Sequence, residues 1–437
     1  MATTSPSRFA FSEWPPALSV AQLEDLTLYA TTYALSHGLL YLPPVKPQPL
    51  IPKSAIHAPL SLFPSPFPRR LFALARRLQS SYNTLYARIA TDVEFLDKVM
   101  GGVEGVGRVD DFVGQLWAGW KNLRDAGLVQ PLQLGLFRSD YLLHAGRKDE
   151  PLTLKQVEFN TISSSFGTLS QRTAALHRYL YASTSYHNVS PDIKAENFPP
   201  NDTTAGLVEG LAAAHAAYNV KEAKILFVVQ AGERNVFDQR LLEYELLEKH
   251  AIHVIRQTFD ELAQTAARSR AIKCPSIALQ LAGGKKVQQV LTQPGQLDGH
   301  VGLDEDAGVQ KAREMADKLV LKPQREGGGN NVYKDEIPSF LDTLAPLERQ
   351  RGSPWNSSCR QRNGQLPCAR GRRGRPARVK VDVVSELGIF GGRCLAGRMA
   401  VSRRRRGWLV RTKGKDSNEG GVATGFSVLD SLLLVDD

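Results

Sequence analysis

Apolar positions recur with a helical period in the first third of the chain and with a strand period further on. The helical spacing begins at Ser19, continues to His37 and returns through a long run over 69–100. Ser19 and Gln22 have the spacing of a capping box, and Gly38 follows the last expected turn. The pattern predicts a helix over 19–37 and one long amphipathic helix over 69–100.

From residue 134 the apolar runs become short and alternating, which is typical of strands. We expect strands at 134–143, 152–163, 223–230, 251–257 and 318–322. A helical pattern over 236–250 separates the third strand from the fourth and predicts a strand–helix–strand unit with parallel strands. Because open parallel sheets bind ligands beyond the carboxyl ends of their strands, the loop Gln230–Asn235 is a candidate site.

Two stretches interrupt this regular patterning. Residues 349–378 contain 9 arginines among 30 residues, and residues 393–406 end in four consecutive arginines. Neither stretch has apolar periodicity, so we expect neither to bury a core face. We expect 349–378 to have no packed structure.

The net charge of +11 comes entirely from residues 349–406, which contain both stretches. Residues 349–406 contain 16 basic and 2 acidic residues, whereas the rest of the chain contains 39 basic and 42 acidic residues. A basic surface spread over a whole fold, as nucleic-acid-binding proteins have, is therefore not predicted. An Arg-rich insert that binds nucleic acid or another polyanion stays open as an alternative, although blocks of like charge are commonly just solvated.

The composition narrows the class of protein further. The chain has 437 residues, of which 42% are hydrophobic, and its 4 cysteines form no CxxC pair. A disulfide scaffold and a zinc ribbon are therefore excluded, and a reducing compartment is expected. No apolar run approaches the length of a membrane span, and no signal peptide is recognisable. We expect a cytoplasmic protein without a membrane partner.

The strongest chemical motif is KPQREGGGNN at Lys322–Asn331, which follows an expected strand. Consecutive glycines let backbone N–H groups approach an anion closely, and Lys322 adds a positive charge, as a phosphate-binding loop requires. The motif is not that of the P-loop NTPases. A simple glycine-rich turn is the structural alternative.

Carboxylate and amide residues near this motif could bind a hard cation. Glu326 lies inside the glycine-rich loop, and Glu158 and Asn160 lie two residues apart on an expected strand, which directs both to one face. The alternative is a pair of solvated polar residues. RTKGKDSNEGGVATG at 411–425 could form a second anion-facing loop or a surface lid.

Other catalytic patterns are weak. His250 and His253 lack the glutamate of a zinc-binding HExxH motif and are interpreted as surface or core histidines. No Ser/His/Asp arrangement and no nucleophilic cysteine stands out, so an acyl-enzyme mechanism has no support.

Seven segments together resemble eukaryotic glutathione synthetase in residues and order: LGLFRSDYLL, QVEFNTISSSFG, GERNVFDQR, KCPSIALQLAGGKKVQQV, LVLKPQREGGGNNVY, VSELGIFGG and LVRTK…EGGVATGFSVLD. The resemblance implies an ATP-grasp-like fold of mixed α+β and α/β class, with a parallel-sheet substrate domain, in a homodimer. It implies an ATP-dependent carbon–nitrogen ligase that joins γ-glutamylcysteine and glycine through an acyl phosphate, with Mg²⁺ required.

The resemblance also assigns roles to individual residues. Magnesium ligands fall on Glu158, Asn160 and Glu326. Catalytic roles fall on Arg138, Lys322 and Arg411. ATP contacts fall on Glu158, Lys285, Lys322, Pro323, Gln324, Arg325, Glu326, Gly327, Gly328, Gly329, Asn330, Asn331, Tyr333, Glu386, Lys413 and Glu419. Substrate contacts fall on Arg138, Ile162, Ser163, Ser164, Ser165, Glu233, Arg234, Asn235, Gln239, Arg411, Val422 and Ala423. Which arginine binds which anion stays open.

The chain departs from the family pattern at four places. A Tyr-Phe-Arg-x-Gly-Tyr segment that contacts substrate is absent between Ala267 and Lys273, the connection between Lys286 and Lys318 is short, and the two Arg-rich runs replace family strands. We interpret these as out-of-frame or unspliced translation and missing exons. Two alternatives follow: a ligase for another acceptor such as β-alanine, and an inactive scaffold with a polyanion-binding insert.

The expected organisation has six parts. They are a disordered terminus 1–18, helices and metal- and substrate-binding strands 19–222, an α/β substrate domain 223–290, a lobe with the glycine-rich loop 291–348, the Arg-rich segment 349–378 and a C-terminal part with a lid loop 379–437.

Overall fold

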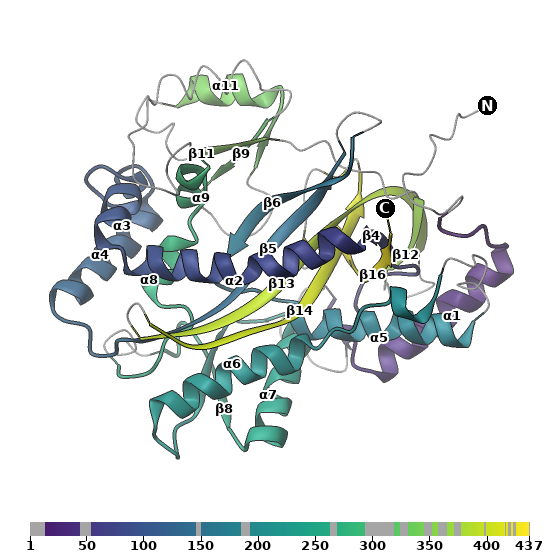
Figure 1. The fold of residues 1–437 in the computed structure, drawn as a ribbon, viewed down its shortest axis with the longest axis horizontal. Helices are drawn as coiled ribbons and strands as arrows, with labels where there is room; N and C mark the ends of the chain where they lie inside the picture. The colour runs from purple at the N-terminus through teal and green to yellow at the C-terminus, as the bar shows by residue number, and fades with distance from the viewer. Residues whose placement is uncertain are drawn as a thin grey trace.

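The computed structural model describes most of the chain, with gaps. It describes residues 14–43, 54–145, 150–184, 193–262, 269–292, 319–323, 331–344, 352–356, 365–370, 377–396, 399–415, 417, 421–422 and 425–436. A long sheet runs through the middle of the molecule and carries helices on both faces (Figure 1).

The central sheet has the strand order β12-β3-β15-β14-β13-β5-β6. Its strands are β3 (Leu60–Ser61), β5 (Leu132–His144), β6 (Thr153–Asn160), β12 (Gln365–Arg370), β13 (Ala377–Ala396), β14 (Met399–Gly414) and β15 (Ser427–Asp430). All pairs are antiparallel except β15 with β3, and β12 also pairs with β13. The expected strands at 134–143 and 152–163 are thus confirmed as the neighbours β5 and β6, although β6 ends at Asn160 and 161–163 belong to the following loop.

Helices cover the two faces of this sheet. Helix α2 (Arg69–Thr91) contacts β5 and β13 on one face, whereas α5 (Gly167–Ser183) and α6 (Thr203–Tyr218) contact β13 and β14 on the other (Figure 1). Successive strand residues point to opposite faces. Tyr141 therefore packs in the core beside α2, while Phe390 packs in the core beside α5.

The first predicted helix is confirmed, and the second is wrong in extent. Helix α1 (Val20–Ser36) begins after Ser19, whose hydroxyl accepts from the Gln22 amide at 3.2 Å while the Gln22 side chain accepts from the Ser19 amide at 3.0 Å. The long run is two helices, α2 and α3 (Val93–Met100), because Asp92 adopts an extended conformation and caps α3 through the Phe95 N–H at 3.0 Å.

The strand–helix–strand unit is confirmed. β7 (Ile225–Val229), α7 (Val236–His250) and β8 (Val254–Thr258) follow one another, and β7 and β8 pair in parallel. His250 and His253 are exposed, as interpreted from the sequence.

A second group of helices packs around the N-terminal part of the chain. Helices α4 (Asp111–Asp125), α8 (Ile277–Ala282) and α9 (Lys285–Leu291) share a core with α2 and α3. This packing brings Lys285 at the start of α9 toward β6, since α9 contacts that strand.

A second, three-stranded sheet holds the segment before the glycine-rich loop. Its order is β10-β9-β11, with β9 (Leu319–Pro323), β10 (Val332–Tyr333) and β11 (Gly352–Asn356). The strand expected at 318–322 is confirmed as β9. Helix α11 (Glu336–Thr343) follows β10, and β11 contacts α9 (Figure 1).

Both Arg-rich runs contain strands, which corrects the expectation that 349–378 lacks packed structure. Within 349–378, β11 pairs with β9 and β12 pairs with β13 and β3. These two strands contain only one of the nine arginines of the segment, Arg370. The physical reason is that a ladder pairs backbone groups whatever the side chains are.

The second run, 393–406, lies in the β13–β14 hairpin. Cys394 pairs with Ser402, and Arg393 is 6% exposed and donates to the Thr84 hydroxyl of α2. The sequence pattern predicts that this run buries no core face; Arg393 is nevertheless buried, because the apolar stem of an arginine can pack while its head finds an acceptor.

The remaining elements are short. They are β1 (Leu40–Tyr41) paired with β2 (Ile56–His57), β4 (Ser65–Pro68) paired in parallel with β16 (Leu432–Val435), and 3₁₀ helices at Val106–Arg108 and Ala195–Asn197. Within the described ranges, none of the helices combines the length and the apolar character that crossing a bilayer would take.

Candidate active site

Charged side chains and one amide from four adjacent strands meet on the face of the central sheet that carries α5. The residues are Arg138 and Asp140 of β5, Glu158 and Asn160 of β6, Glu386 of β13 and Arg411 of β14. Strand register creates the meeting: Asp140 lies opposite Glu158, and Glu386 lies opposite Arg411. Cross-strand partners have neighbouring side chains, so residues far apart in sequence form one cluster.

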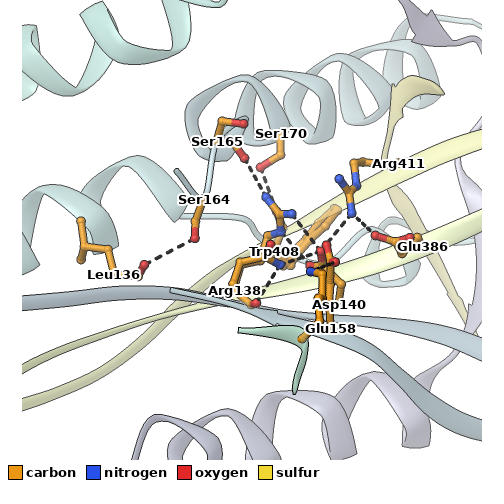
Figure 2. A network of polar contacts seen from close by, with 12 residues as sticks. Leu136, Arg138, Asp140, Glu158, Ser164, Ser165, Ser170, Glu386, Trp408 and Arg411 are labelled. Carbon is orange, nitrogen blue, oxygen red and sulfur yellow. Dashed lines mark hydrogen bonds and ion pairs between the residues drawn. The ribbon is translucent and has the colours of Figure 1, made fainter. Parts of the chain in front are cut away.

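The Asp140 carboxylate is the centre of this cluster (Figure 2). Arg138 binds it with two donors, Nε to Oδ1 at 2.7 Å and Nη2 to Oδ2 at 2.8 Å. Arg411 Nη2 donates to Oδ2 at 2.9 Å and also to Glu386. Asn160 Nδ2 donates to the same Oδ2 at 3.0 Å. One buried carboxylate therefore accepts from three residues that the sequence assigned to the site.

Burial and the neighbouring charges shift the pKa values of Asp140 and Arg411 in opposite directions. Burial raises the pKa of Asp140 to about 6, although Arg138 and Arg411 oppose the rise. Burial lowers the pKa of Arg411, but Glu386, Asp140 and Glu158 more than compensate and raise it above its usual range. Arg411 is therefore a permanent cation inside a largely enclosed site.

The two arginines differ in the donors that they use. Arg138 commits Nε and Nη2 to Asp140 and donates from Nη1 to the Ser165 carbonyl oxygen at 3.2 Å, and its guanidinium lies over the Phe390 ring. Among the described residues, Arg411 uses only Nη2, which leaves Nε and Nη1 without a protein acceptor. Arg411 is the arginine with donors to offer an anionic ligand.

A second ion pair borders the cluster. Lys285 Nζ lies 3.0 Å from Glu158 Oε2, and both side chains are largely buried. Phe159, between Glu158 and Asn160 on β6, points to the other face and stacks on Tyr86. The predicted orientation of Glu158 and Asn160 to one face is thus confirmed.

The loop after β6 is held by a carboxylate from α7. Ser163 and Phe166 have positive φ angles of 51° and 66°. Asp238 accepts from the backbone N–H groups of Phe166 at 2.6 Å, Thr168 at 2.9 Å and Leu169 at 3.1 Å, and so caps α5 from outside. Ile162 is half-buried, Ser163 is exposed, and Ser164 donates to Leu136 O at 3.4 Å (Figure 2).

The predicted contacts of the loop after β7 also form a network. Glu233 accepts from the Asn235 amide at 2.8 Å and from the Gln239 side chain at 3.0 Å. Arg256 of β8 donates to Gln239 at 2.6 Å. The Arg234 guanidinium lies 4.8 Å from the centre of the Tyr41 ring. Glu233, Arg234 and Asn235 lie in the loop at the carboxyl end of β7, as the sequence predicted.

The predicted ATP-binding residues are only partly described. The backbones of Lys322 and Pro323 end β9, and Asn331 donates to the Tyr333 hydroxyl at 3.0 Å beside it. Lys413 is half-buried on β14, and Val422 packs in the core cluster that includes Leu429. Predicted site residues outside the described part of the chain are Gln324, Arg325, Glu326, Gly327, Gly328, Gly329, Asn330, Glu419 and Ala423.

Sequence reasoning missed three residues that shape the site. Asp140 carried a usable signal, since it lies two residues after Arg138 on a strand and must share its face. Asp238 and Gly388 carried none. Gly388 lies opposite Asp140, and a Cβ there would come within 2.8 Å of both Arg138 Cδ and Asp140 Oδ1.

The fold and the site together indicate the class of protein to which the chain belongs. A solved glutathione synthetase-like effector from Globodera pallida, in its apo form, matches with a TM-score of 0.74 and 25% sequence identity, over 96% of this chain and 98% of that chain. The class is that of the mixed, ATP-grasp-like ligase fold expected from the sequence.

The particular family follows from two sequence comparisons. The family model described as eukaryotic glutathione synthase, ATP binding domain, matches residues 20–434. Glutathione synthetase of Homo sapiens is 34% identical over 94% of this chain and 96% of its own length, and the large chain of Schizosaccharomyces pombe is 33% identical over 94% and 98%. The chain belongs to the eukaryotic glutathione synthase family.

The comparison also bears on the missing segments. The alignment with the human protein occupies 472 positions, more than the 437 residues of this chain. The human protein therefore has segments without a counterpart here, in agreement with the shortened connections found in the sequence.

Proposed function

We propose that this chain is an ATP-dependent ligase that joins glycine to γ-glutamylcysteine and so makes glutathione. The observation that carries the proposal is the cluster of Arg138 and Arg411 around Asp140, beside the Lys285–Glu158 pair, in a chain of this family. Such a cluster suits reactants that are themselves carboxylates and phosphates.

The reaction needs a site that binds and orients anions. The dipeptide carboxylate would attack the γ-phosphorus of ATP and release ADP, and the glycine amine would then displace phosphate from the acyl phosphate. Phosphoryl transfer depends mainly on positioning and charge stabilisation. Arg411, with two donors left over and its charge fixed by its neighbours, suits the anion whose charge develops during these steps.

The metal proposal rests on donor chemistry. Asn160 uses its amide nitrogen toward Asp140 and the Arg138 carbonyl oxygen, which directs its amide oxygen the other way. With a Glu158 oxygen on the same face, this gives two hard ligands of the kind that Mg²⁺ prefers. Glu326 would be the third, and it lies outside the described residues. Bound Mg²⁺ would neutralise phosphate charge and orient the triphosphate.

The test is ADP release by the purified full-length chain. We expect release that requires γ-glutamylcysteine and glycine together and that stops when a chelator removes Mg²⁺. Omitting each reactant in turn is the control. ADP release that ignores glycine, or no release at any reactant concentration, would contradict the proposal.

A different acceptor is the second candidate. The segment that is absent between Ala267 and Lys273 contributes substrate contacts in the family pattern, and the alignment with the human protein requires segments that this chain lacks. Replacing glycine by β-alanine in the same assay separates the two, because the better acceptor gives the higher kcat/KM.

We further propose a cytoplasmic homodimer, as the family resemblance implies. Light scattering coupled to size exclusion measures the mass directly. A particle of twice the 48.1 kDa chain mass supports the dimer, and a monomer at micromolar concentration argues against it.

A further inference from the structure

We infer that Asp140 is a positioning residue for the ligase site, the common acceptor that holds Arg138, Arg411 and Asn160 in their working orientations. The inference rests on the proposed function and deepens it. None of the family assignments above gives Asp140 a role, and it binds no reactant itself, since its side chain is only 1% exposed.

The hydrogen bonds converge on one atom. Asp140 Oδ2 accepts from Arg138 Nη2 at 2.8 Å, from Arg411 Nη2 at 2.9 Å and from Asn160 Nδ2 at 3.0 Å. The donors come from three different strands, β5, β14 and β6. No other described residue accepts printed hydrogen bonds from all three side chains, so Asp140 is their common acceptor.

The negative charge is needed because the two guanidinium groups approach each other. Both donate to the same oxygen, which places two like charges close together in a poorly solvated place. An amide in place of the carboxylate could accept from one guanidinium but would present N–H groups to its neighbours. The guanidinium donors would then be left unpaired or displaced, which is costly for buried cations.

Asp140 also fixes the metal side of the site. An amide can face either way, and Asn160 is held with its nitrogen toward Asp140 Oδ2 and Arg138 O, at 3.0 and 3.3 Å. This orientation turns the amide oxygen away from the carboxylate, which is the orientation that a cation ligand needs. Asp140 therefore links the orientation of the anion-binding arginines to that of a metal ligand.

The sheet is built around this group. Gly388 lies directly opposite Asp140 on β13, and any Cβ at that position would meet Asp140 Oδ1 and Arg138 Cδ at 2.8 Å. The glycine therefore provides the space that the bidentate Arg138–Asp140 pair occupies. Because Gly388 leaves space for this one ion pair, the packing supports a specific positioning role for Asp140.

The experiment compares the whole chain with its Asp140→Asn variant. Calorimetric titration with γ-glutamylcysteine, without metal or nucleotide, measures the arginine side of the site directly. We expect binding to weaken by about tenfold or more, the effect of losing a hydrogen bond to a charged group. Ser139→Ala is the matched control, because Ser139 immediately precedes Asp140 on β5, is fully buried and points to the opposite face.

A second experiment measures how Asp140 affects the binding of Mg²⁺. Binding of a non-hydrolysable ATP analogue is titrated against Mg²⁺ in wild type, Asp140→Asn, Asn160→Ala and the double variant. If Asp140 acts through the Asn160 amide, each single change raises the half-saturating Mg²⁺ concentration and the double change adds little more. A residue that only stabilised the fold would lower the melting temperature and leave this concentration unchanged.

A second variant covers the case in which Asp140→Asn does not fold. Asp140→Glu keeps the charge but moves it by one methylene group, so we expect it to weaken dipeptide binding as well. Dipeptide and Mg²⁺ affinities within twofold of wild type in either folded variant would overturn the inference while leaving the ligase proposal intact. A wild-type chain that binds no dipeptide and releases no ADP would overturn both.

Discussion

At the scale of single residues, the site depends on space as much as on charge. The pairing of β13 with β5 places Gly388 against the Arg138–Asp140 pair, where a methyl group has no room. Elsewhere in the same hairpin, a Cβ on Gly414 would meet no atom within 4 Å among the described residues, its two chain neighbours aside. Of these two glycines of one hairpin, only Gly388 is required by a lack of space.

We predict that Gly388→Ala lowers kcat/KM for ligation by about 10- to 100-fold, because it displaces both partners of the ion pair from their positions. The steady-state ADP assay measures this. Gly414→Ala is the matched control, since its methyl group meets nothing. Equal activity of the two variants would show that the pair tolerates displacement.

At the scale of elements, the strand–helix–strand unit holds the active-site loop through one carboxylate. Asp238 of α7 accepts three backbone N–H groups at the start of α5 and the Thr168 hydroxyl at 2.7 Å. These N–H groups have no partner inside their own helix. The unit therefore serves as the cap of α5 and fixes the turn that contains Ser163 and Phe166.

We predict that Asp238→Asn destabilises the chain by about 1–3 kcal/mol, because an amide would turn an N–H toward donors that need an acceptor. Urea unfolding of both proteins gives the difference. Asp202→Asn is the control: Asp202 is the N-cap residue of α6, but its side chain makes no capping hydrogen bond. A loss of equal size in both variants would refute the capping account.

At the scale of the whole molecule, a buried polar network joins distant parts of the chain. Asp430 accepts from Ser61 and Ser65 at 2.6 Å each, and His177 of α5 contacts Ser431 Oγ at 2.6 Å and the Ser61 carbonyl oxygen at 2.9 Å. The network connects β3 and β4 to the C-terminal strands and α5. Its members are satisfied only when all these segments are in place.

The histidine makes stability depend on pH. Burial lowers the pKa of His177 below its ordinary 6.5, although Asp430 and Ser61 oppose this. The unfolded chain therefore binds a proton at His177 before the native chain does, so stability falls as pH drops below about 6.5, by up to about 1.4 kcal/mol per pH unit. We predict that His177→Gln reduces this slope in urea unfolding at several pH values. A slope unchanged from wild type would contradict the assignment, and exposed His250→Gln is the control.

The Arg-rich segment also acts at this scale. Deleting 349–378 would remove β12, a strand of the central sheet, so charge substitution is the cleaner test of a polyanion-binding insert. We predict that replacing Arg372, Arg373 and Arg375 by Gln leaves ligation intact, because none of the site residues assigned in this chain falls there. A chain that releases no ADP, yet binds an oligonucleotide in a steeply salt-dependent way that this variant loses, would favour the inactive scaffold instead.

Local patterns were sufficient to determine much of this protein. The capping box of α1, the parallel β7–β8 unit and the common face of Glu158 and Asn160 all follow from spacing of a few residues, since helix and strand periods act over short distances. The glycine-rich motif, together with the other segments and the order in which they occur, was sufficient to indicate the family, which the comparisons confirm.

Only the tertiary structure decided how the charges combine. Arg138 and Arg411 share an acceptor because β14 pairs with β13 and β13 pairs with β5, in a register that brings the two arginines to one place. Strand order and register depend on residues far apart in the chain, so local spacing does not supply them. The same holds for Asp238 capping a helix 70 residues earlier in the chain and for the strands in the Arg-rich runs. Backbone pairing across the sheets placed the strands and their charged residues, and the packing of α7 against α5 placed Asp238.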